Sequence, residues 1–158
     1  MRAAARHIQV FLAPSATMSE MFARFGLGPE RLRRCDQGID LEPFRVFRRQ
    51  PSTILRLGYA GGLIPSKAPH VLLEAASRMP AGSVSVDVLG GGGAFHGDDS
   101  YARRIAPLLA LPFVRRTGFV PHERMPEALA AVDVVVVPSV WIENAPFIIR
   151  EAFASGAG

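Results

Sequence analysis

Several kinds of residue are scarce in this sequence, and each shortage narrows the class of protein. The chain of 158 residues has one cysteine, Cys35, so it forms no internal disulfide and the sequence predicts a reducing compartment, with the cytoplasm as the default. Its apolar runs are shorter than the roughly 20 residues that span a bilayer. The run 8–13, ended by Pro14, is also too short for the core of a signal peptide. We therefore expect a globular protein with no membrane-spanning segment.

A single lysine, Lys67, stands among 18 basic residues, so arginine carries almost all of the positive charge. The net charge of +4 favours anionic partners such as nucleotide phosphates, anionic lipid head groups or nucleic acid. Nucleic acid is not expected, because the arginine clusters fall at element ends and in connections rather than on a recognition helix or among exposed aromatic side chains. The clusters are Arg31, Arg33 and Arg34; Arg45, Arg48 and Arg49; Arg103 and Arg104; Arg115 and Arg116.

From residue 54 onward the chain alternates between short strands and amphipathic helices. Each strand is followed by a loop rich in glycine or proline, which is typical of an α/β fold with a doubly wound, Rossmann-like parallel sheet. Four consecutive valines between Asp133 and Pro138 predict a last strand that is buried on both faces. We predict strands at 54–59, 84–89, 114–119 and 134–137, and helices at 70–79, 101–111, 125–131 and 147–155.

Two of these helices carry more specific expectations. The helix at 101–111 is expected to be interrupted near Pro107, because proline removes a helical hydrogen bond. The helix at 70–79 is expected to turn four apolar residues inward, namely Val71, Leu72, Ala75 and Ala76.

The first 42 residues form a smaller pattern, with strands at 7–13 and 31–35 around a helix at 16–25 that Ser15 caps. Cys35 is expected to be a small buried hydrophobe, because no catalytic partners can be assigned to it. Residues 43–52 are rich in arginine and carry proline near both ends, which indicates a linker. The predicted division is therefore 1–42, a linker at 43–52, and a main domain at 53–158.

The loop before the last helix carries two carboxylates. Glu143 lies in the loop and Glu151 about one turn inside the helix, so we expect the two to flank one crevice. Asn144 can cap this helix, and Pro146 sits where a first-turn proline is tolerated. Ligands of open parallel sheets bind beyond the carboxyl ends of the strands, and free N–H groups at a helix start attract phosphate. Because a carboxylate accepts hydrogen bonds from two neighbouring hydroxyls at once, the arrangement indicates a sugar nucleotide.

Two other strands end in glycine-rich loops. Gly61 and Gly62 precede Lys67, whose mobile charge suits a diphosphate oxygen. The four glycines at 90–93 do not continue as a dinucleotide fingerprint, because Phe95 occupies the position of its last glycine, so a nicotinamide-dependent oxidoreductase is disfavoured.

Three residues of the second loop, His96, Asp98 and Asp99, have side chains that can ligate metals. A flexible polar loop with one histidine is more often solvated. We therefore predict no metal site there.

The loop and helix together resemble the Glu-x7-Glu signature of retaining glycosyltransferases of the GT-B fold, family 4. Glu143 and Glu151 are separated by seven residues. That spacing alone is a weak signal, since any acidic helix supplies it by chance. The longer string Pro-Ser-x-Trp-x-Glu-Asn-x-Pro-Phe-Ile-Ile-x-Glu-Ala is specific, and it resembles a bacterial branch of the family.

Other segments match the family less completely. Gly61, Leu63 and Lys67 agree with its Gly-Arg-Leu-x-x-x-Lys-Gly pattern, whereas Gly62 and Ala68 depart from it. The missing arginine implies one fewer phosphate contact. Residues 118–123 resemble the family's Gly-x-Val-x-x-x-Glu connection, in which backbone groups contact the base, and His122 there is expected to be a surface residue.

The resemblance implies transfer of a sugar from a nucleotide-diphosphate sugar, a co-substrate, to a glycan, lipid-linked or small-molecule acceptor, with retained anomeric configuration and no metal or other cofactor. Glu143 would bond hydroxyls of the donor sugar, Lys67 the diphosphate and Glu151 the ribose. The base would lie against Phe119 and Val120. The remaining donor-binding residues would be Gly61, Gly62, Gly90, Asn144, Ala145, Pro146, Phe147 and Ile148.

The resemblance also implies that the chain is an incomplete GT-B enzyme. It would comprise the tail of the acceptor-binding N-terminal domain and most of the donor-binding C-terminal domain. Because positioning of the acceptor against the donor supplies much of catalysis, this stretch alone is expected to be inactive.

One alternative of a different class stays open. It is a non-catalytic module of Rossmann-like fold that binds a nucleotide or an anionic surface, using the same crevice or the arginine clusters. Peripheral contact with the anionic inner face of a membrane is a further expectation from those clusters. Added salt separates the two hypotheses, because surface electrostatics weaken with ionic strength whereas ribose and sugar contacts persist.

Overall fold

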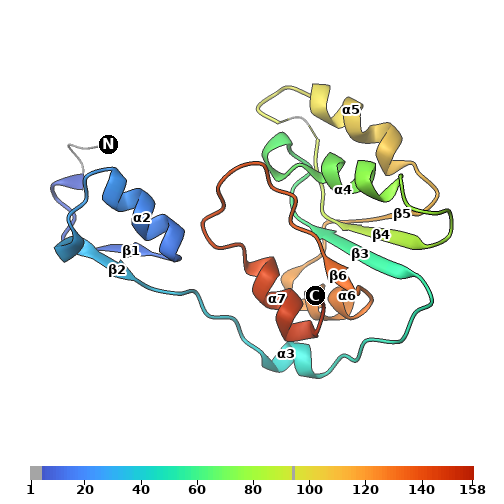
Figure 1. Ribbon diagram of the computed structural model, residues 1–158, viewed down its shortest axis with the longest axis horizontal. Coiled ribbons are helices and arrows are strands. Elements are labelled where there is room, and N and C mark those ends of the chain that lie inside the picture. Colours follow the sequence, from blue (N-terminus) through green and yellow to red (C-terminus); the bar gives the residue numbers. More distant parts are fainter. Residues whose placement is uncertain (1–4, 94) are drawn as a thin grey trace. The chain divides into compact units, whose positions relative to one another are not determined.

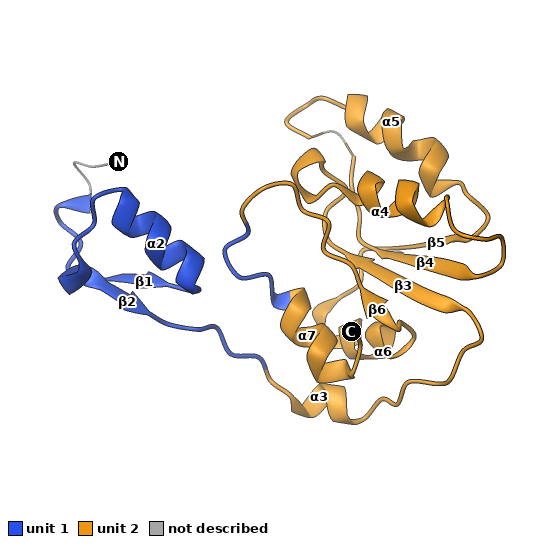
Figure 2. Cartoon of the chain, in the orientation of Figure 1, with its two compact units in different colours: residues 1–39, 143–147 blue, residues 40–142, 148–158 orange. Residues whose placement is uncertain are grey.

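The computed structural model describes residues 5–93 and 95–158, which form two compact units (Figure 2). The first unit comprises Met1–Ile39 with Glu143–Phe147, and the second comprises Asp40–Ile142 with Ile148–Gly158. Each unit contains a parallel sheet, of two strands in the first and four in the second, counted over these described residues.

The first unit is a small strand, helix, strand arrangement. Strand β1 (Phe11–Ala13) pairs in parallel with β2 (Leu32–Arg34), and helix α2 (Ala16–Arg24) lies between them in the chain, followed by the short η1 (Pro29–Arg31). The predicted cap is confirmed, because the Ser15 hydroxyl accepts a hydrogen bond from the Met18 N–H at 3.2 Å. The prediction of a buried Cys35 is wrong: its side chain is exposed, directly after the last residue of β2.

The second unit is built on parallel strands in the order β5-β4-β3-β6. Their bounds are β3 Leu55–Ala60, β4 Val84–Leu89, β5 Val114–Gly118 and β6 Val134–Val135. The predicted α/β fold with a parallel sheet is confirmed, and the starts of all four strands agree with prediction to within one residue. The helical elements are α3 Glu42–Arg45, η2 Pro65–Lys67, α4 Pro69–Ala76, α5 Ser100–Leu109, η3 His122–Arg124, α6 Met125–Ala130 and α7 Phe147–Ser155.

The chain reverses its direction of travel across this sheet. It steps outward from β3 to β4 and β5, then returns to place β6 on the other side of β3. Because crossovers between parallel strands are right-handed, stepping in opposite directions puts the connecting helices on opposite faces. Figure 1 shows this arrangement, with α4 and α5 on one face and α6 and α7 on the other. The reversal creates a switch point between β3 and β6, where open sheets of this kind bind ligands.

The hydrophobic core lies on the sheet face that carries α4 and α5, which we call the apolar face. Alternate residues of a strand point to opposite faces, and Leu57 and Tyr59 of β3 point here together with the valines of β4. They pack against Leu73 of α4 and Ile105 of α5, both almost completely buried. The other buried members of this cluster are Leu63, Leu72, Ala76, Val84, Val86, Val88, Tyr101 and Leu109.

The intervening strand residues point to the opposite face, which we call the ion-paired face. Asp87 of β4 is 6% exposed and pairs with Arg115 of β5, whose Nε lies 2.5 Å from the Asp87 Oδ1. Val132 packs directly against Gly58 of β3, where a larger residue would not fit: a Cβ there would lie 2.7 Å from a Val132 methyl group. This face therefore carries charge pairs and a close backbone approach, and α6 on the same side adds the buried Leu129.

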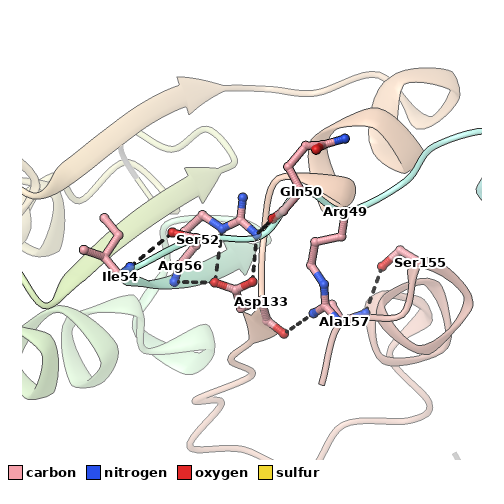
Figure 3. Close-up of polar contacts among 8 residues, drawn as sticks. All are labelled: Arg49, Gln50, Ser52, Ile54, Arg56, Asp133, Ser155 and Ala157. Carbon is pink, nitrogen blue, oxygen red and sulfur yellow. Dashed lines mark hydrogen bonds and ion pairs between the residues drawn. The ribbon is translucent and has the colours of Figure 1, made fainter.

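A second ion pair joins β3 to the chain before β6, as Figure 3 shows. The Asp133 carboxylate accepts hydrogen bonds from the backbone N–H of Arg56 and from its guanidinium, at 2.8–3.1 Å. The same guanidinium donates to the Gln50 carbonyl at 2.6 Å, and Arg49 donates to the Asp133 carbonyl at 3.1 Å. The Arg56 hydrogen bonds lower the pKa of Asp133 to about 2, against the opposing effect of burial.

The valine strand differs from its prediction. Regular pairing extends only over Val134–Val135, and the four valines are half-buried rather than buried on both faces. The reason is that β6 lies at one end of the described sheet order, with β3 on one side. In addition, the Val135 N–H donates to the Gly158 carbonyl at 2.9 Å.

Two helix predictions are also corrected. Helix α4 buries Pro69, Leu72, Leu73 and Ala76, whereas Val71 and Ala75 are exposed, so two of the four residues predicted to face inward were wrong. The true inward stripe follows the i, i+3, i+4, i+7 spacing from Pro69. Helix α5 runs unbroken through Pro107, because this proline lies in its last turn on the exposed side.

Candidate functional site

Two glycine-rich loops meet at the carboxyl ends of β3 and β4. The Gly61 N–H donates to the Leu89 carbonyl at 3.2 Å, and the Leu63 N–H donates to the Gly91 carbonyl at 3.1 Å. A Cβ on Gly90 would collide with the carbonyl oxygen of Gly61, and one on Gly92 would lie 2.6 Å from the Leu63 Cβ. The loops therefore continue the pairing of the strands, and they approach this closely because glycine stands at 90 and 92.

A side chain of β3 also holds the loop that follows this strand. The buried Tyr59 hydroxyl donates to the Gly62 carbonyl at 2.7 Å. Further along, η2 ends at Lys67, and Ala68 adopts a left-handed conformation with φ of 48° before α4 begins. The family pattern has glycine at this position. The left-handed conformation costs an L-residue such as alanine about 1–2 kcal/mol. Half-buried Lys67 is thereby placed at the start of α4.

A cavity of about 550 Å³ opens beyond these strand ends. Its floor consists of the two glycine loops, and one wall is formed by the segment after β5 and the beginning of α6. The last wall is the α7 face that carries Glu151. The lining residues are Ala60, Gly61, Gly62, Leu89, Gly90, Gly91, Phe119, Val120, Met125, Ile148 and Glu151.

Glu151 is the chemically distinctive member of this lining. Of the described residues that line the cavity, it carries the one ionisable side chain, and it is only 5% exposed. Burial raises the pKa of this carboxyl, and the nearby His122 opposes that rise. Nδ1 of His122 lies 3.4 Å from Oε1 of Glu151. Glu151 is therefore a buried carboxyl group in a largely apolar environment.

Most of the predicted donor-binding residues of the second unit lie together in the cavity. They are Gly61, Gly62, Gly90, Phe119, Val120, Ile148 and Glu151. Phe119 stands at the rim and is 82% exposed. Lys67 lies on η2 and is not part of the lining.

The other predicted residues belong to the first unit. Glu143, Asn144, Ala145, Pro146 and Phe147 cluster with Met1–Ile39, whereas Glu151 belongs to the second unit. Glu143 is half-buried and Asn144 is exposed. Helix α7 begins at Phe147, so Pro146 precedes its first residue. The shared crevice of Glu143 and Glu151 stays a prediction.

Some contributors to the site were missed by the sequence reasoning. Leu89 and Met125 line the cavity, and the Tyr59 hydroxyl fixes its floor. His122 was expected to be an ordinary surface residue, and its side chain is indeed 79% exposed, yet it contacts Glu151. No local sequence signal reveals that contact. It arises because the segment after β5 and helix α7 line the same cavity.

The polar loop at 91–99 contains no candidate metal site among its described residues. Asp98 accepts hydrogen bonds from the Ser100 N–H and hydroxyl at 2.8 Å, and Asp99 pairs with Arg103 at 2.5 Å. Across the described residues no group of three histidine, cysteine or acidic side chains is arranged to hold a metal ion. The described helices also include none long and apolar enough to cross a membrane.

The sheet order, the glycine loops at the strand ends and the helix that follows β6 define a Rossmann-like domain of the GT-B type. Solved structures agree with this assignment. The fold matches Anabaena HepE in complex with UDP and glucose with a TM-score of 0.82 and 23% identity, over 99% of this chain and 45% of that one. It matches sucrose-phosphate synthase from Thermosynechococcus elongatus with a TM-score of 0.73 and 21% identity, over 92% of this chain and 38% of that one.

The chain belongs to the glycosyl transferases group 1 family, whose sequence profile matches residues 55–157. It is 32% identical over 103 residues to the putative glycosyltransferase YtcC of Bacillus subtilis, covering 62% of this chain and 25% of that protein. It is 30% identical over 154 residues to D-inositol 3-phosphate glycosyltransferase 2 of Catenulispora acidiphila, covering 87% of this chain and 36% of that protein. The chain thus spans a quarter to about a third of these relatives. The resemblance to GT-B glycosyltransferases, inferred from the glutamate string, is confirmed.

Proposed function

We propose that the protein transfers a sugar from a nucleotide-diphosphate sugar to an acceptor with retained anomeric configuration. The observation that carries the proposal is Glu151, a carboxylate buried in a cavity that is otherwise apolar or glycine-lined. A buried carboxylate is costly unless hydrogen bonds satisfy it. The two neighbouring hydroxyls of a ribose supply such bonds to both carboxylate oxygens.

The rest of the cavity suits the rest of a nucleotide. Phe119 and Val120 present an apolar surface for a base, and the glycine loops let backbone come close to a diphosphate. Lys67, at the start of α4, supplies a mobile positive charge for the diphosphate. Support for a nucleotide-sugar donor comes from HepE, which has been crystallised in complex with UDP-glucose.

The remaining predicted residues complete the proposed mechanism. Glu143 bonds hydroxyls of the transferred sugar, and the amides of residues 144–148 contact the phosphate and sugar. As the glycosidic bond breaks, the departing diphosphate gains negative charge, and Lys67 with these fixed N–H groups stabilises it. The acceptor proton passes to the departing phosphate on the same face, so the proposal assigns no protein general base and requires no metal.

The wider context is proposed on the same basis. Residues 1–42 belong to an acceptor-binding domain, 43–52 to a linker, and 53–158 to the donor-binding domain. The acceptor is a glycan, a lipid-linked molecule or a small molecule. The lone Cys35 suits a reducing compartment, so we place the reaction in the cytoplasm.

Calorimetric titration of the intact protein with UDP and UDP-glucose tests the proposal. Glu151→Gln is expected to weaken UDP binding by about 1.5–3 kcal/mol, because hydrogen bonds to a charged group are lost. Glu143→Ala is expected to spare UDP and weaken UDP-glucose. Glu74→Gln on α4, outside the cavity lining, is the matched control and should change neither. Equal losses of UDP affinity in the Glu151 and Glu143 variants would refute the division of roles.

Lys67 is tested by comparing UDP with uridine. Lys67→Ala should weaken UDP far more than uridine, because only UDP carries the charge that the lysine meets. Similar losses for both ligands would remove Lys67 from the proposed site. Retention is checked separately by the NMR coupling constant of the anomeric proton in the product.

A second candidate function, binding of an anionic surface without chemistry, has one observation in its favour. A cavity of about 580 Å³ beside β5 is lined in part by Arg115, Arg116 and Arg124. Two of these arginines are already paired, Arg115 with Asp87 and Arg124 with Glu127. Binding of UDP that persists at high salt favours the glycosyltransferase, whereas loss of all binding at high salt favours this alternative.

A further inference from the structure

The contact between His122 and Glu151 joins a solvent-exposed base to a buried acid. His122 is the first residue of η3, directly after the segment that lines the cavity, and its side chain is 79% exposed. The Glu151 side chain is 7% exposed, and its Oε1 lies 3.4 Å from the histidine Nδ1. This distance is longer than a short charged hydrogen bond, so the contact acts chiefly through charge.

The surroundings leave His122 as the electrostatic partner of Glu151. The other described residues that line the cavity are apolar or glycine. The charged residues nearest in sequence are Arg150 on α7 and Glu123 and Arg124 on η3, and Arg124 is paired with Glu127 at 3.2 Å. Beyond burial, the influence acting on Glu151 is the charge of His122.

We propose that His122 is a positioning residue for the donor site: it holds Glu151 in the ionised, hydrogen-bond-accepting form and thereby preserves nucleotide binding in mild acid. The proposal rests on the proposed function, in which an ionised Glu151 bonds the ribose hydroxyls. A protonated carboxyl there would lose its charge and part of its capacity to accept hydrogen bonds.

The direction of the effect follows from two opposing influences. Burial favours the neutral acid, so the pKa of Glu151 is raised and its protonation begins at a higher pH than for an exposed glutamate. A positive charge on His122, 3.4 Å away, opposes that rise and favours the ionised carboxylate.

The contact itself is tested without any nucleotide. Carboxyl carbon NMR titration of the intact protein, labelled on glutamate, follows the protonation of Glu151 in the wild type and in His122→Ala, His122→Gln and His122→Arg. We expect Glu151 to protonate at a higher pH in the Ala and Gln variants and near the wild-type pH in the Arg variant. An unchanged titration of Glu151 in His122→Ala would overturn the proposal. Because His122 is exposed, these variants should unfold at the wild-type temperature.

The consequence for the site is tested by titrating UDP at a series of pH values. His122→Ala should lose UDP affinity several-fold between neutral and mildly acidic pH, where the wild type and His122→Arg retain it. His96→Ala, which removes another exposed histidine outside the cavity lining, is the matched control and should behave as the wild type. If Glu151→Gln weakens UDP but His122→Ala leaves the pH profile unchanged, the inference fails and the proposed function stands. If Glu151→Gln has no effect, the proposed function itself fails.

Discussion

The two faces of the four-stranded sheet are stabilised by different kinds of interaction. On the apolar face, Leu57, Val86 and their neighbours pack against α4 and α5. Arg56 and Asp87 of the ion-paired face are the sequence neighbours of Leu57 and Val86. Each of them pairs with a residue of opposite charge. Parallel strands are usually apolar on both sides. Alternation within two strands is thus enough to give one sheet an apolar face and a face that carries charge pairs.

The largest expected effect is on the apolar face. Ile105→Ala removes aliphatic groups from a side chain that is 1% exposed and leaves a cavity against the sheet. We expect it to lower the free energy of unfolding by about 2–5 kcal/mol, measured by urea denaturation. The loss should be insensitive to salt. An exposed apolar control, Val71→Ala on α4, should cost much less, and a similar cost for both would contradict the assignment of the apolar face.

On the ion-paired face, Asp133→Asn should have the next largest effect. The substitution keeps the shape of the side chain but removes the charge that accepts three hydrogen bonds from Arg56. We expect a loss of about 1.5–3 kcal/mol in urea denaturation. Asp99→Asn, which breaks the exposed pair with Arg103, should cost no more than about 1 kcal/mol. Equal losses would mean that the Asp133 pair behaves as a surface contact.

The same pair predicts a pH dependence. The pKa of Asp133 is about 2 in the folded protein, below its ordinary value of 3.8, so the carboxylate stabilises the fold fully above that ordinary value. As the pH falls toward 2 the advantage is lost. The difference in unfolding free energy between wild type and Asp133→Asn should therefore shrink over this interval. A difference that stays constant down to pH 2 would show that the charge of Asp133 does not contribute.

The pair of Asp87 and Arg115 should respond asymmetrically. Arg115→Ala leaves a carboxylate that is 6% exposed without its partner, and we expect a loss of about 1–3 kcal/mol. Asp87→Asn should cost less, because the arginine side chain is 69% exposed and water can solvate it. Urea denaturation of both variants measures the two losses. A larger loss for Asp87→Asn than for Arg115→Ala would contradict the prediction.

The smallest expected effect comes from the edge of the apolar face. The Tyr101 hydroxyl lies 2.8 Å from Nδ1 of His70 and joins α5 to α4. Tyr101→Phe removes this hydrogen bond and keeps the ring in the core, so we expect a loss of about 0.5–1.5 kcal/mol by thermal denaturation. A loss as large as that of Ile105→Ala would show that this face also depends on its polar contacts.

Much of this arrangement was accessible from the sequence, for reasons that can be stated residue by residue. The starts of the strands follow from runs such as the valines after Asp133, and the Ser15 cap follows from residue type. The pairing of Arg56 with Asp133 could not be predicted, because it depends on the register that places Leu57 opposite Val134. The contact of His122 with Glu151 likewise depends on how β5 and α7 converge.

The helix errors have a common physical cause. Val71 and Leu73 are both apolar, so composition alone cannot fix which of them faces the sheet. The phase is set by where α4 begins, and that is determined by the left-handed turn at Ala68. The predicted start at residue 70 is one residue later than the observed start at Pro69, and a shift of one residue rotates the stripe by about 100°.

The glycine floor has a consequence for changing what the site accepts. Its hydrogen bonds run between backbone groups of the two loops, so any residue larger than glycine at 90 is rejected whichever ligand is present. Substitution does not change these backbone groups, so it cannot alter the contacts that they make. Under the proposed function, random substitution of the loop glycines is expected to disrupt the cavity in most variants. Random substitution of Phe119 and Met125, whose side chains line the same cavity, is expected to change which bases bind while the loops keep their structure.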